Sequence, residues 1–194
     1  MKKIKREENK TYVYLIRHAH WDGPEKGPHK FNPNYPLSAK GRAQAKVLAK
    51  KLFPMKESVE VFFTSSMGRA KETAVIVSRL IKKQAIESNK LWEFNKILWT
   101  RKYYHYKYWK NYLRHKKTIR EFNRILAENK GKVILIVAHG NMIKGILKNK
   151  QKLSYQKIKD MDYKNCHITL MKFNGSKLEK VHCFNSKEPI MIKN

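Results

Sequence analysis

The sequence predicts an α/β fold: a three-layer α/β/α sandwich with a mostly parallel central sheet. Two apolar runs, 12–16 and 132–137, are rich in valine, isoleucine, leucine and tyrosine, as expected of strands buried in a sheet. Amphipathic helical patterns lie between these strands, and strands that alternate with helices usually form a parallel sheet covered on both faces. A chain of 194 residues is long enough to bury a large core, so we expect a single domain over 1–194.

The N-terminal part of the chain is expected to form a strand, a long loop and a helix. Residues 1–10 are charged and predict a basic, mobile lead-in to the strand 12–16. The stretch 19–36 is polar, contains glycines and prolines and has no periodicity, which indicates a long loop of a kind that often carries function. Apolar residues at helical spacing then predict a helix over 39–52, for which Ser38 is a suitable N-cap.

A second strand and a second helix are expected next. The apolar segment 59–63 predicts a strand, and the hydroxyl residues 64–66 predict the N-cap of the helix that follows. The inner face of this helix is expected to consist of Ala70, Thr73, Ala74, Val77, Leu80 and Ile81. Residues 85–87 predict a short strand at the edge of the sheet.

The segment 91–128 combines aromatic residues with positive charge. No acidic residue occurs over 94–120, whereas lysine, arginine and tyrosine recur through most of it. The spacing of its apolar residues predicts a helix over about 104–128. The buried face of that helix is expected to consist of Trp109, Tyr112, Ile119, Phe122 and Leu126, with Lys116 interrupting the stripe.

The C-terminal part predicts the remaining strands and one more helix. The core strand 132–137 is followed by an Ala-His-Gly-Asn motif and by a helix with apolar residues over 143–147. Two further strands are expected at about 167–173 and 178–184. A turn at 174–175 joins them, because Asn-Gly favours tight hairpins.

The composition indicates a basic globular protein with anionic partners. The chain has 44 lysines and arginines against 15 aspartates and glutamates, a formal net charge of +29. Such an excess attracts phosphoesters, nucleic acid or an acidic membrane surface. A hydrophobic content of 41% with 11% aromatics excludes a wholly disordered chain. The N-terminus is charged and no apolar run has the length of a signal peptide or a membrane span, so we expect a soluble cytoplasmic protein.

The two cysteines give no sign of a metal centre. Cys166 and Cys183 lack the spacing of a metal site and of a Cys-x-x-Cys motif. We therefore expect two reduced, buried thiols and no metal site.

Polar residues follow three of the predicted strands. Arg17 and His18 follow the first strand, the segment 64–66 follows the second, and His139 follows the later core strand. The carboxyl ends of parallel strands meet at one edge of a sheet, where such folds bind ligands. A guanidinium suits phosphate or carboxylate, and a histidine serves as nucleophile, base or acid near neutral pH. Taken alone, the pair Arg17-His18 is more simply interpreted as a strand end that faces solvent.

Five short motifs, in order along most of the chain, give this pair a context. They are Leu15-Ile16-Arg17-His18-Ala19, the helix start 36–45, the segment 63–74 that contains Arg69, Leu91-Trp92-Glu93, and Val137-Ala138-His139-Gly140-Asn141. In order and spacing they resemble the motifs of the histidine phosphatase superfamily, in its phosphoglycerate-mutase-like branch. Ala19 replaces the glycine of that family's Arg-His-Gly signature, and the segment 63–74 lacks the family's usual proline.

The resemblance implies a phosphoglycerate-mutase-like fold and a phosphatase that forms a phosphohistidine intermediate. It implies that His18 is the nucleophile that accepts the phosphoryl group and that Glu93 is the proton donor. The residues it implies around the transferred phosphate are Arg17, Arg69, His139 and Asn141, with His139 also among the catalytic residues. His20 lies two residues past the nucleophile and is an additional candidate for the phosphate pocket.

Phosphoryl transfer needs the charges that these residue types supply. Its transition state is loose and spreads charge over the equatorial oxygens, so catalysis consists mainly of placement and preorganised positive charge. Two guanidiniums and an imidazole supply that charge without a metal, and no cofactor is implied. His18 must present a neutral nitrogen while its other nitrogen is held as N–H. Glu93 would protonate the leaving oxygen and then activate water to hydrolyse the phosphohistidine.

Hydrolysis is favoured over two other functions. A phosphoglycerate-mutase-type phosphotransferase usually carries an Asn-Glu-Arg-His-Tyr-Gly-like stretch around its acid, and 91–95 does not resemble it. A non-catalytic module could bind anions or nucleic acid through the basic segment 94–120. The presence of Arg17, His18 and the other motif residues argues against a module without a working site.

The basic and aromatic segment 94–128 falls where the resembling family inserts a cap over its active site. Its composition suits a phosphorylated small molecule, a phosphoprotein or single-stranded nucleic acid as the partner. A solvated basic face on an amphipathic cap helix is the simpler interpretation.

Overall fold

The computed structural model describes residues 3–23, 32, 34–94, 106–152, 163–184 and 191–193. Their centre is a six-stranded sheet with strand order β4-β3-β5-β2-β6-β7. The strands are β2 (Lys10–Arg17), β3 (Val61–Ser65), β4 (Ile86–Ser88), β5 (Val133–Ala138), β6 (Ile168–Asn174) and β7 (Lys177–Phe184). β4, β3, β5 and β2 run parallel, and β6 and β7 complete the sheet in antiparallel pairing.

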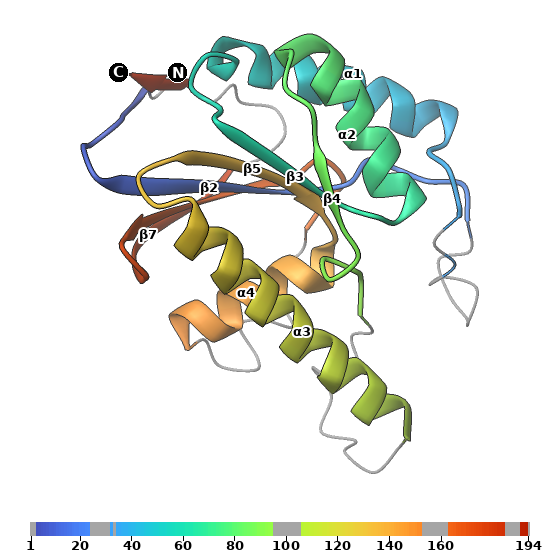
Figure 1. The fold of residues 1–194 in the computed structure, drawn as a ribbon. Helices are drawn as coiled ribbons and strands as arrows, with labels where there is room; N and C mark the ends of the chain where they lie inside the picture. The colour runs from blue at the N-terminus through green and yellow to red at the C-terminus, as the bar shows by residue number, and fades with distance from the viewer. Residues whose placement is uncertain are drawn as a thin grey trace.

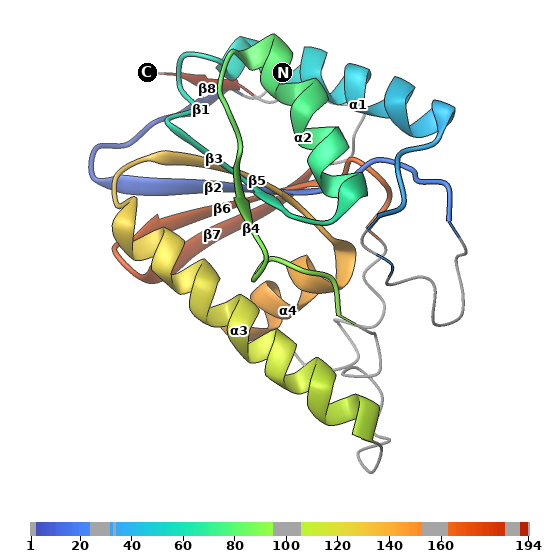
Figure 2. The same cartoon turned by 45° about the vertical axis from the view of Figure 1, so that its right-hand side comes forward.

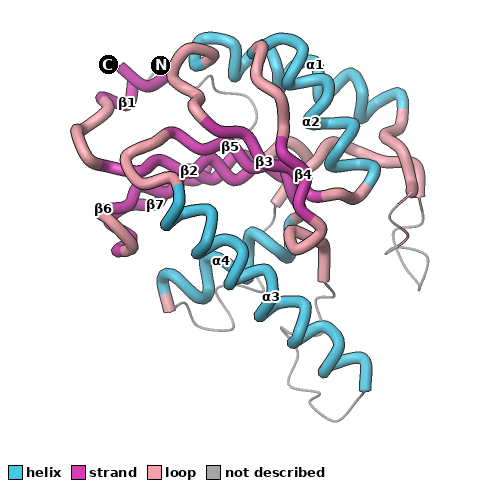
Figure 3. The backbone as a smooth tube through the Cα atoms, in the orientation of Figure 1, coloured by secondary structure: helices cyan, strands magenta, loops and turns pink. Residues whose placement is uncertain are grey.

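Helices cover both faces of this sheet. α1 (Ala39–Leu52) and α2 (Gly68–Ile81) lie on one face, and α3 (Tyr106–Glu128) and α4 (Gly140–Gln151) lie on the other (Figure 1). A short 3-10 helix, η2 (Phe53–Met55), follows α1 directly. Figure 3 shows the resulting layers, with the strands between two pairs of helices. The predicted α/β/α sandwich with a mostly parallel sheet is confirmed.

Alternation along the central strands divides the core between the two faces. In β2, Tyr12, Tyr14 and Ile16 belong to the core formed with α1 and α2, whereas Val13 and Leu15 belong to the core formed with α3 and α4. β5 is buried at every position. A parallel strand covered by helices on both sides has no solvent-facing positions, which explains why its sequence is continuously apolar.

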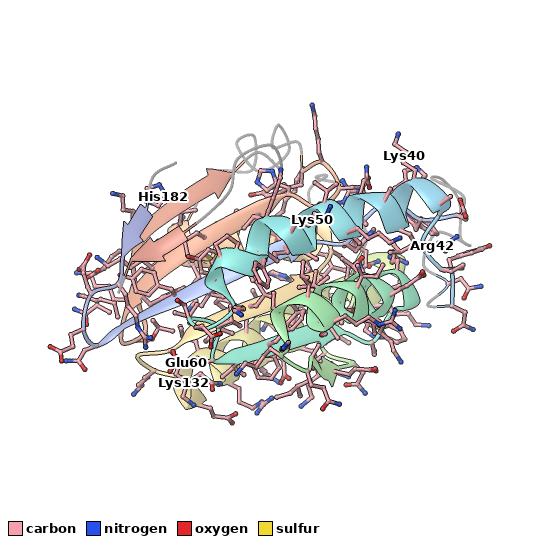
Figure 4. All side chains as sticks on the ribbon, turned by 90° about the horizontal axis from the view of Figure 1, so that it is seen from above. Lys40, Arg42, Lys50, Glu60, Lys132 and His182 are labelled. Atoms are coloured by element: carbon pink, nitrogen blue, oxygen red, sulfur yellow. The ribbon has the colours of Figure 1, made fainter. Side chains whose placement is uncertain are left out.

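α1 matches its prediction and begins at the carboxyl end of the parallel strands. The helix spans Ala39–Leu52, and Ser38 caps it by accepting a hydrogen bond of 2.9 Å from the N–H of Gly41. Figure 4 labels Lys40 at this start of α1 and Glu60 at the opposite end of the sheet, just before β3. The loop between β2 and α1 therefore lies at the edge where such folds bind ligands.

β3 begins two residues after its predicted start, and α2 begins after its predicted cap segment. Parallel pairing with β5 carries the β3 ladder through to Ser65. The predicted N-cap at 64–66 is wrong, because α2 begins at Gly68 and its N-cap, Met67, makes no side-chain capping bond. Leu80 was expected on the inner face of α2 but is 36% exposed, while the other predicted inner residues are buried.

α3 packs on the sheet through its C-terminal half. The buried side chains described in this helix are Thr118, Glu121, Phe122, Ile125 and Leu126. The N-terminal half extends beyond the sheet (Figure 2), and the prediction that Trp109 is buried is wrong, since it is 61% exposed. Tyr112 and Ile119 are partly buried against the core. Positions 104 and 105, where the helix was predicted to begin, lie outside the described residues.

A second, two-stranded sheet joins segments from the two ends of the chain. β1 (Lys3–Lys5) pairs in parallel with β8 (Met191–Lys193), apart from the six-stranded sheet (Figure 2). The expectation of a lead-in over 1–10 is therefore wrong for β1 and for Lys10, where β2 already begins. Three-residue strands are too short to show periodicity, and their pairing joins opposite ends of the sequence.

The cysteines differ in their surroundings. Both are free thiols, and Cys166 is buried as expected whereas Cys183 is exposed. Within the described ranges, no helix is long and apolar enough to cross a membrane.

Candidate active site

The carboxyl ends of β2, β3 and β5 bring three polar side chains together. His18 follows β2, Ser65 ends β3 and His139 follows β5. The rings of His18 and His139 pack edge to face with centroids 5.1 Å apart. The Nε2 atom of His139 lies 2.8 Å from Oγ of Ser65. All three side chains are buried, and they form the floor of the candidate site.

His18 is held in one protonation pattern. Its Nδ1 lies 2.7 Å from the carbonyl oxygen of Ala19, and because a carbonyl oxygen only accepts, we assign the ring proton to Nδ1. Nε2 is then an acceptor, and it receives a hydrogen bond of 3.1 Å from the Nε–H of Arg69. The lone pair of a buried, neutral imidazole thus points at a cation inside the site.

The turn before β6 holds the backbone that carries His18. The side-chain amide of Asn165 donates to the carbonyl oxygen of His18 at 3.0 Å. The N–H of Cys166 donates to the carbonyl oxygen of Arg17, also at 3.0 Å. Cys166 has a φ of 59°, a left-handed conformation that non-glycine residues rarely adopt. This turn, which has an unusual backbone conformation, therefore supports the segment that carries the candidate nucleophile.

A threonine of α2 links the residue after His18 to Arg69. The N–H of Ala19 donates to Oγ1 of Thr73 at 3.1 Å, and this hydroxyl donates to the carbonyl oxygen of Arg69 at 2.7 Å. The methyl group of Ala19, at the position where the resembling family has glycine, is fully buried in the core with α1 and α2. The departure from the motif is thus accommodated by packing.

Arg69 is a buried cation with spare hydrogen-bonding capacity. It is 2% exposed, and its guanidinium lies 4.7 Å from the ring of Trp21. Its Nη1 atom is buried and has no hydrogen-bond partner among the described residues. Burial lowers the pKa of Arg69, the carboxylate of Glu93 opposes this shift, and the charge of Arg17 adds to it. An anion bound beside Nη1 would satisfy the donor and balance the charge.

His139 is neutral in the folded protein. Burial lowers its pKa well below the ordinary value, and the positive charges of Arg69 and Arg17 add to the shift. Nε2 is engaged by Ser65, while Nδ1 is buried without a hydrogen-bond partner among the described residues. A neutral ring with one nitrogen fixed in this way can direct the other toward an oxygen of a bound phosphate.

Arg17 lies at the edge of the same cluster. Its Nη1 donates to the carbonyl oxygen of Tyr163. Its side chain lies beside Gly140, where a Cβ would be in ordinary contact with Cδ and Nε of the arginine at 3.6 Å. The structure thus brings Arg17, Arg69 and His139 around His18, as the resemblance implies for the residues that hold the phosphate.

Glu93 is buried, and its carboxylate is close enough to Arg69 to oppose the lowering of the arginine's pKa by burial. Its Oε1 accepts a hydrogen bond of 3.2 Å from the N–H of Phe94. The side-chain amide of Asn141, at the start of α4, donates to the carbonyl oxygen of Phe94 at 3.0 Å. Asn141 therefore anchors the segment that carries the candidate acid, and its contact with phosphate stays a prediction.

His20 makes its contacts with the start of α1. Its Nδ1 lies 2.7 Å from Oγ of Ser38, and its N–H donates to Oε1 of Gln44 at 2.9 Å. Its carbonyl oxygen would lie 1.7 Å from a Cβ at position 41, so the close approach of loop and helix requires Gly41. These contacts position the loop, and a direct role of His20 toward phosphate stays a prediction.

Two residues of the site, Trp21 and Asn165, were not predicted from the sequence. Ser65 belongs to the segment 64–66, which was expected both at the ligand-binding edge and in a helix cap, but it was given no individual role at the site. Trp21 and Asn165 carry no motif signal, because they meet Arg69 and His18 through folding from other segments. In the described part of the chain, no group of three or more His, Cys, Asp and Glu side chains is placed to hold a metal ion.

Comparison with known families agrees with this geometry. The family model of the histidine phosphatase superfamily (branch 1) matches residues 13–118 and 114–186. The chain belongs to this superfamily. The predicted resemblance is confirmed, and so, at the level of the family, is an enzyme of the histidine phosphatase type.

Similar proteins within this fold include phosphatases and a mutase. A protein of Hydrogenobacter thermophilus, whose name proposes a phosphoserine phosphatase, is 24% identical over 191 residues, which cover 88% of this chain and 93% of the relative. A mycobacterial glucosyl-3-phosphoglycerate phosphatase has a TM-score of 0.69 and 17% identity, with 90% of this chain and 97% of that chain covered. Phosphoglycerate mutase of Bacillus anthracis has a TM-score of 0.70 and 17% identity, with 91% and 93% covered. The phosphoglycerate-mutase-like fold is thus confirmed, and it is compatible with both reactions.

Proposed function

We propose that the chain is a phosphomonoester hydrolase that works through a phosphohistidine intermediate on Nε2 of His18. The observation that carries the proposal is the hydrogen bonding of this ring, with Nδ1–H held by the Ala19 carbonyl and Nε2 facing the Arg69 guanidinium. The nucleophilic nitrogen is therefore unprotonated and lies next to a charge that attracts phosphate. Two guanidiniums supply the required charge, so the proposed mechanism is independent of metal.

In the first step the Nε2 lone pair attacks phosphorus in line with the leaving oxygen. The P–N bond forms as the P–O bond breaks, and Arg69 turns its donors from Nε2 to the phosphoryl oxygens. Arg17 and His139 stabilise the remaining equatorial charge. Glu93 transfers its proton to the leaving oxygen, so that the product leaves as a neutral alcohol.

In the second step water replaces the alcohol. The Glu93 carboxylate takes a proton from water, whose oxygen attacks phosphorus as the P–N bond breaks. The bonding electrons return to Nε2 of His18, which restores the neutral imidazole, and inorganic phosphate leaves. Glu93 is then protonated and ready for the next substrate.

The proposed substrates are phosphorylated small molecules or phosphoproteins. The name of the Hydrogenobacter relative, which mentions phosphoserine, supports a phosphomonoester of this kind. Phosphotransfer to a second hydroxyl is the alternative, because it shares the phosphohistidine step. Incubation with phosphoserine or 3-phosphoglycerate distinguishes them, since hydrolysis releases inorganic phosphate whereas a mutase yields an isomeric phosphoester.

Replacement of the nucleophile tests the proposal. His18→Ala is expected to lower the rate of hydrolysis of an aryl phosphate by about 1,000-fold or more, because no covalent intermediate can form. His182→Ala, on β7 away from the candidate site (Figure 4), is the matched control and should retain activity. Activity that persists in His18→Ala, or that a chelator abolishes in the unmodified enzyme, would contradict the mechanism.

Replacement of the acid tests the role of Glu93. Glu93→Gln cannot donate a proton, so hydrolysis of an alkyl phosphate should fall far more than hydrolysis of an activated aryl phosphate. The ratio of kcat/KM for the two esters is the measurement. Equal losses on both esters would assign the proton transfer to another group.

A further inference from the structure

A basic groove runs along α3 beside the segment that follows β4. It encloses about 850 Å³ between α3 and residues 89–92. Its cationic lining residues are Lys90, Lys110, Arg114, Lys117, Arg120 and Arg124. α3, which forms one wall of this groove, lies on the opposite side of the sheet from α1 and α2 (Figure 1). The mechanism proposed above does not use the groove.

The positive charge of the basic groove is only partly balanced by the protein itself. Glu121 is the carboxylate that lines it, and it is buried. Its oxygens accept hydrogen bonds from Arg124 at 3.0 and 3.1 Å and from Ser88 at 2.8 Å, contacts that lower the pKa of Glu121. Lys117 and Arg120 are exposed and form no ion pair with any described residue. An anionic ligand would therefore meet cations that are not already neutralised.

The basic groove borders the segment that carries the candidate acid. Trp92 lines the groove and directly precedes the candidate acid Glu93. Its indole N–H donates to Oγ of Ser66. Ser66 follows Ser65, whose hydroxyl contacts His139. Arg114 lies 5.6 Å from the Trp92 ring and donates from Nη1 to the carbonyl oxygen of Glu93 at 3.5 Å. A chain bound in the groove would thus lie beside the backbone that carries the acid.

The dimensions favour an extended polypeptide. The cations of α3 from Lys110 to Arg124 span about 21 Å of helix axis, the length of about six residues of extended chain. A single small metabolite would contact a fraction of them. The groove is hollow, so a polypeptide chain fits it better than a flat membrane surface does.

The aromatic content of the groove argues against nucleic acid. Single-stranded nucleic acid binds by stacking its bases on available aromatic faces. Trp92 is the aromatic residue of the lining, and it is partly buried, with the Arg114 guanidinium already over its ring and its N–H bonded to Ser66. Carboxylates on a peptide need no such platform, because lysines and arginines recognise them directly.

We propose that the basic groove binds an acidic, extended segment of a phosphoprotein whose phosphorylated residue enters the active site. The inference rests on the proposed hydrolase function and identifies its substrate class as protein-borne phosphomonoesters. Two observations support this inference: the charge complementarity of the groove, and the position of Trp92, which lines the groove and directly precedes Glu93.

Binding to the full-length protein tests the groove separately from catalysis. The probe is a fluorescent peptide with phosphoserine followed by about six acidic residues, bound to a His18→Ala background so that no turnover occurs. Lys117→Gln/Arg120→Gln should weaken its Kd by about tenfold. The matched control Lys46→Gln/Lys50→Gln removes the same charge from exposed positions of α1, on the other face of the sheet, and should change Kd by less than about twofold.

A second variant and a second substrate complete the test. Lys90→Gln, from the other wall of the groove, should weaken peptide binding in the same direction. With His18 restored, Lys117→Gln/Arg120→Gln should lower the ratio of kcat/KM for the acidic phosphopeptide to that for an aryl phosphate by about tenfold. Thermal unfolding of each variant checks that the fold is retained.

The outcomes separate the two proposals. Equal weakening by the groove and control variants would overturn the groove and leave the phosphohistidine mechanism intact. Tighter groove-dependent binding of an equally charged oligonucleotide, or of inorganic tripolyphosphate, would overturn the acidic peptide as occupant. Groove-dependent peptide binding together with full activity of His18→Ala would overturn the mechanism and leave the groove intact.

Discussion

Among single residues, Ser65 determines how His139 meets a ligand. Its Oγ contacts Nε2 of His139 at 2.8 Å and accepts a hydrogen bond from the N–H of Met67 at 3.3 Å. Two contacts therefore hold the Ser65 hydroxyl in place, and Ser65 in turn orients the imidazole of His139. Because His139 is fully buried, water cannot readily replace this contact.

Removal of the Ser65 hydroxyl should lower activity more than stability. Ser65→Ala frees the His139 ring to rotate and leaves a buried nitrogen unsatisfied, so we expect kcat to fall about tenfold. Steady-state kinetics on an aryl phosphate give kcat and KM. Ser78→Ala, a partly buried serine on α2, is the matched control and should leave both constants unchanged. A Ser65→Ala enzyme with full kcat would show that His139 needs no such support.

Between elements, the contact of the β2–α1 loop with α1 leaves no room for a side chain. A Cβ at Gly41 would lie 1.7 Å from the His20 carbonyl oxygen, which belongs to the backbone and cannot rotate away. Gly41→Ala should therefore cost about 3 kcal/mol of unfolding free energy, measured by urea denaturation. Gly140→Ala is the control, because its Cβ would meet Arg17 at an ordinary 3.6 Å. Equal stability of the two variants would contradict the role of this close approach.

The packing of α3 on α4 makes stability depend on pH. His115 of α3 lies against the ring of Phe94, and burial and the charge of Lys148 lower the pKa of His115 to about 4. In the unfolded chain the pKa of His115 is about 6.5, so the unfolded state binds the proton first as the pH falls. Stability conferred at neutral pH is therefore lost progressively between about pH 6.5 and 4.

Urea denaturation at several pH values measures this effect. After allowance for the partial exposure of His115, its contribution is on the order of 2 kcal/mol. His115→Asn has no titrating ring, so its unfolding free energy should fall less than that of the unmodified protein over this range. His139 has a lowered pKa in both proteins and drops out of the difference. Parallel pH profiles would assign the loss to other groups.

The elements also show where local pattern suffices. The helix Ala39–Leu52 has an N-cap, a regular apolar stripe and a following proline, and it forms where these signals predict. The start of α2 depends on how far β3 pairs with β5, which is a contact between distant segments. In α3 the spacing of apolar residues is helical throughout, but the sheet lies under its C-terminal half, so Trp109 stays exposed.

Across the whole molecule, the net charge of +29 surrounds the site with a positive field. Such a field speeds the encounter with anionic substrates and is screened by salt. We expect kcat/KM for a dianionic aryl phosphate to fall about threefold or more between ionic strengths of about 0.01 M and 0.15 M. The value of kcat, which follows binding, should change far less. A kcat/KM independent of salt would show that the field does not guide substrate.

The sequence by itself determined the family, the layered fold and the principal candidates His18, Arg17, Arg69, Glu93 and His139, because these rest on short motifs and on periodicities that neighbouring residues create. Tertiary structure decided what those residues touch. Only the meeting of segments distant in the chain shows that Arg69 donates to Nε2 of His18, that Ser65 holds His139, and that Asn141 supports the segment of the acid. Hydrogen bonds and burial depend on distance in space, and one sequence records only distance along the chain.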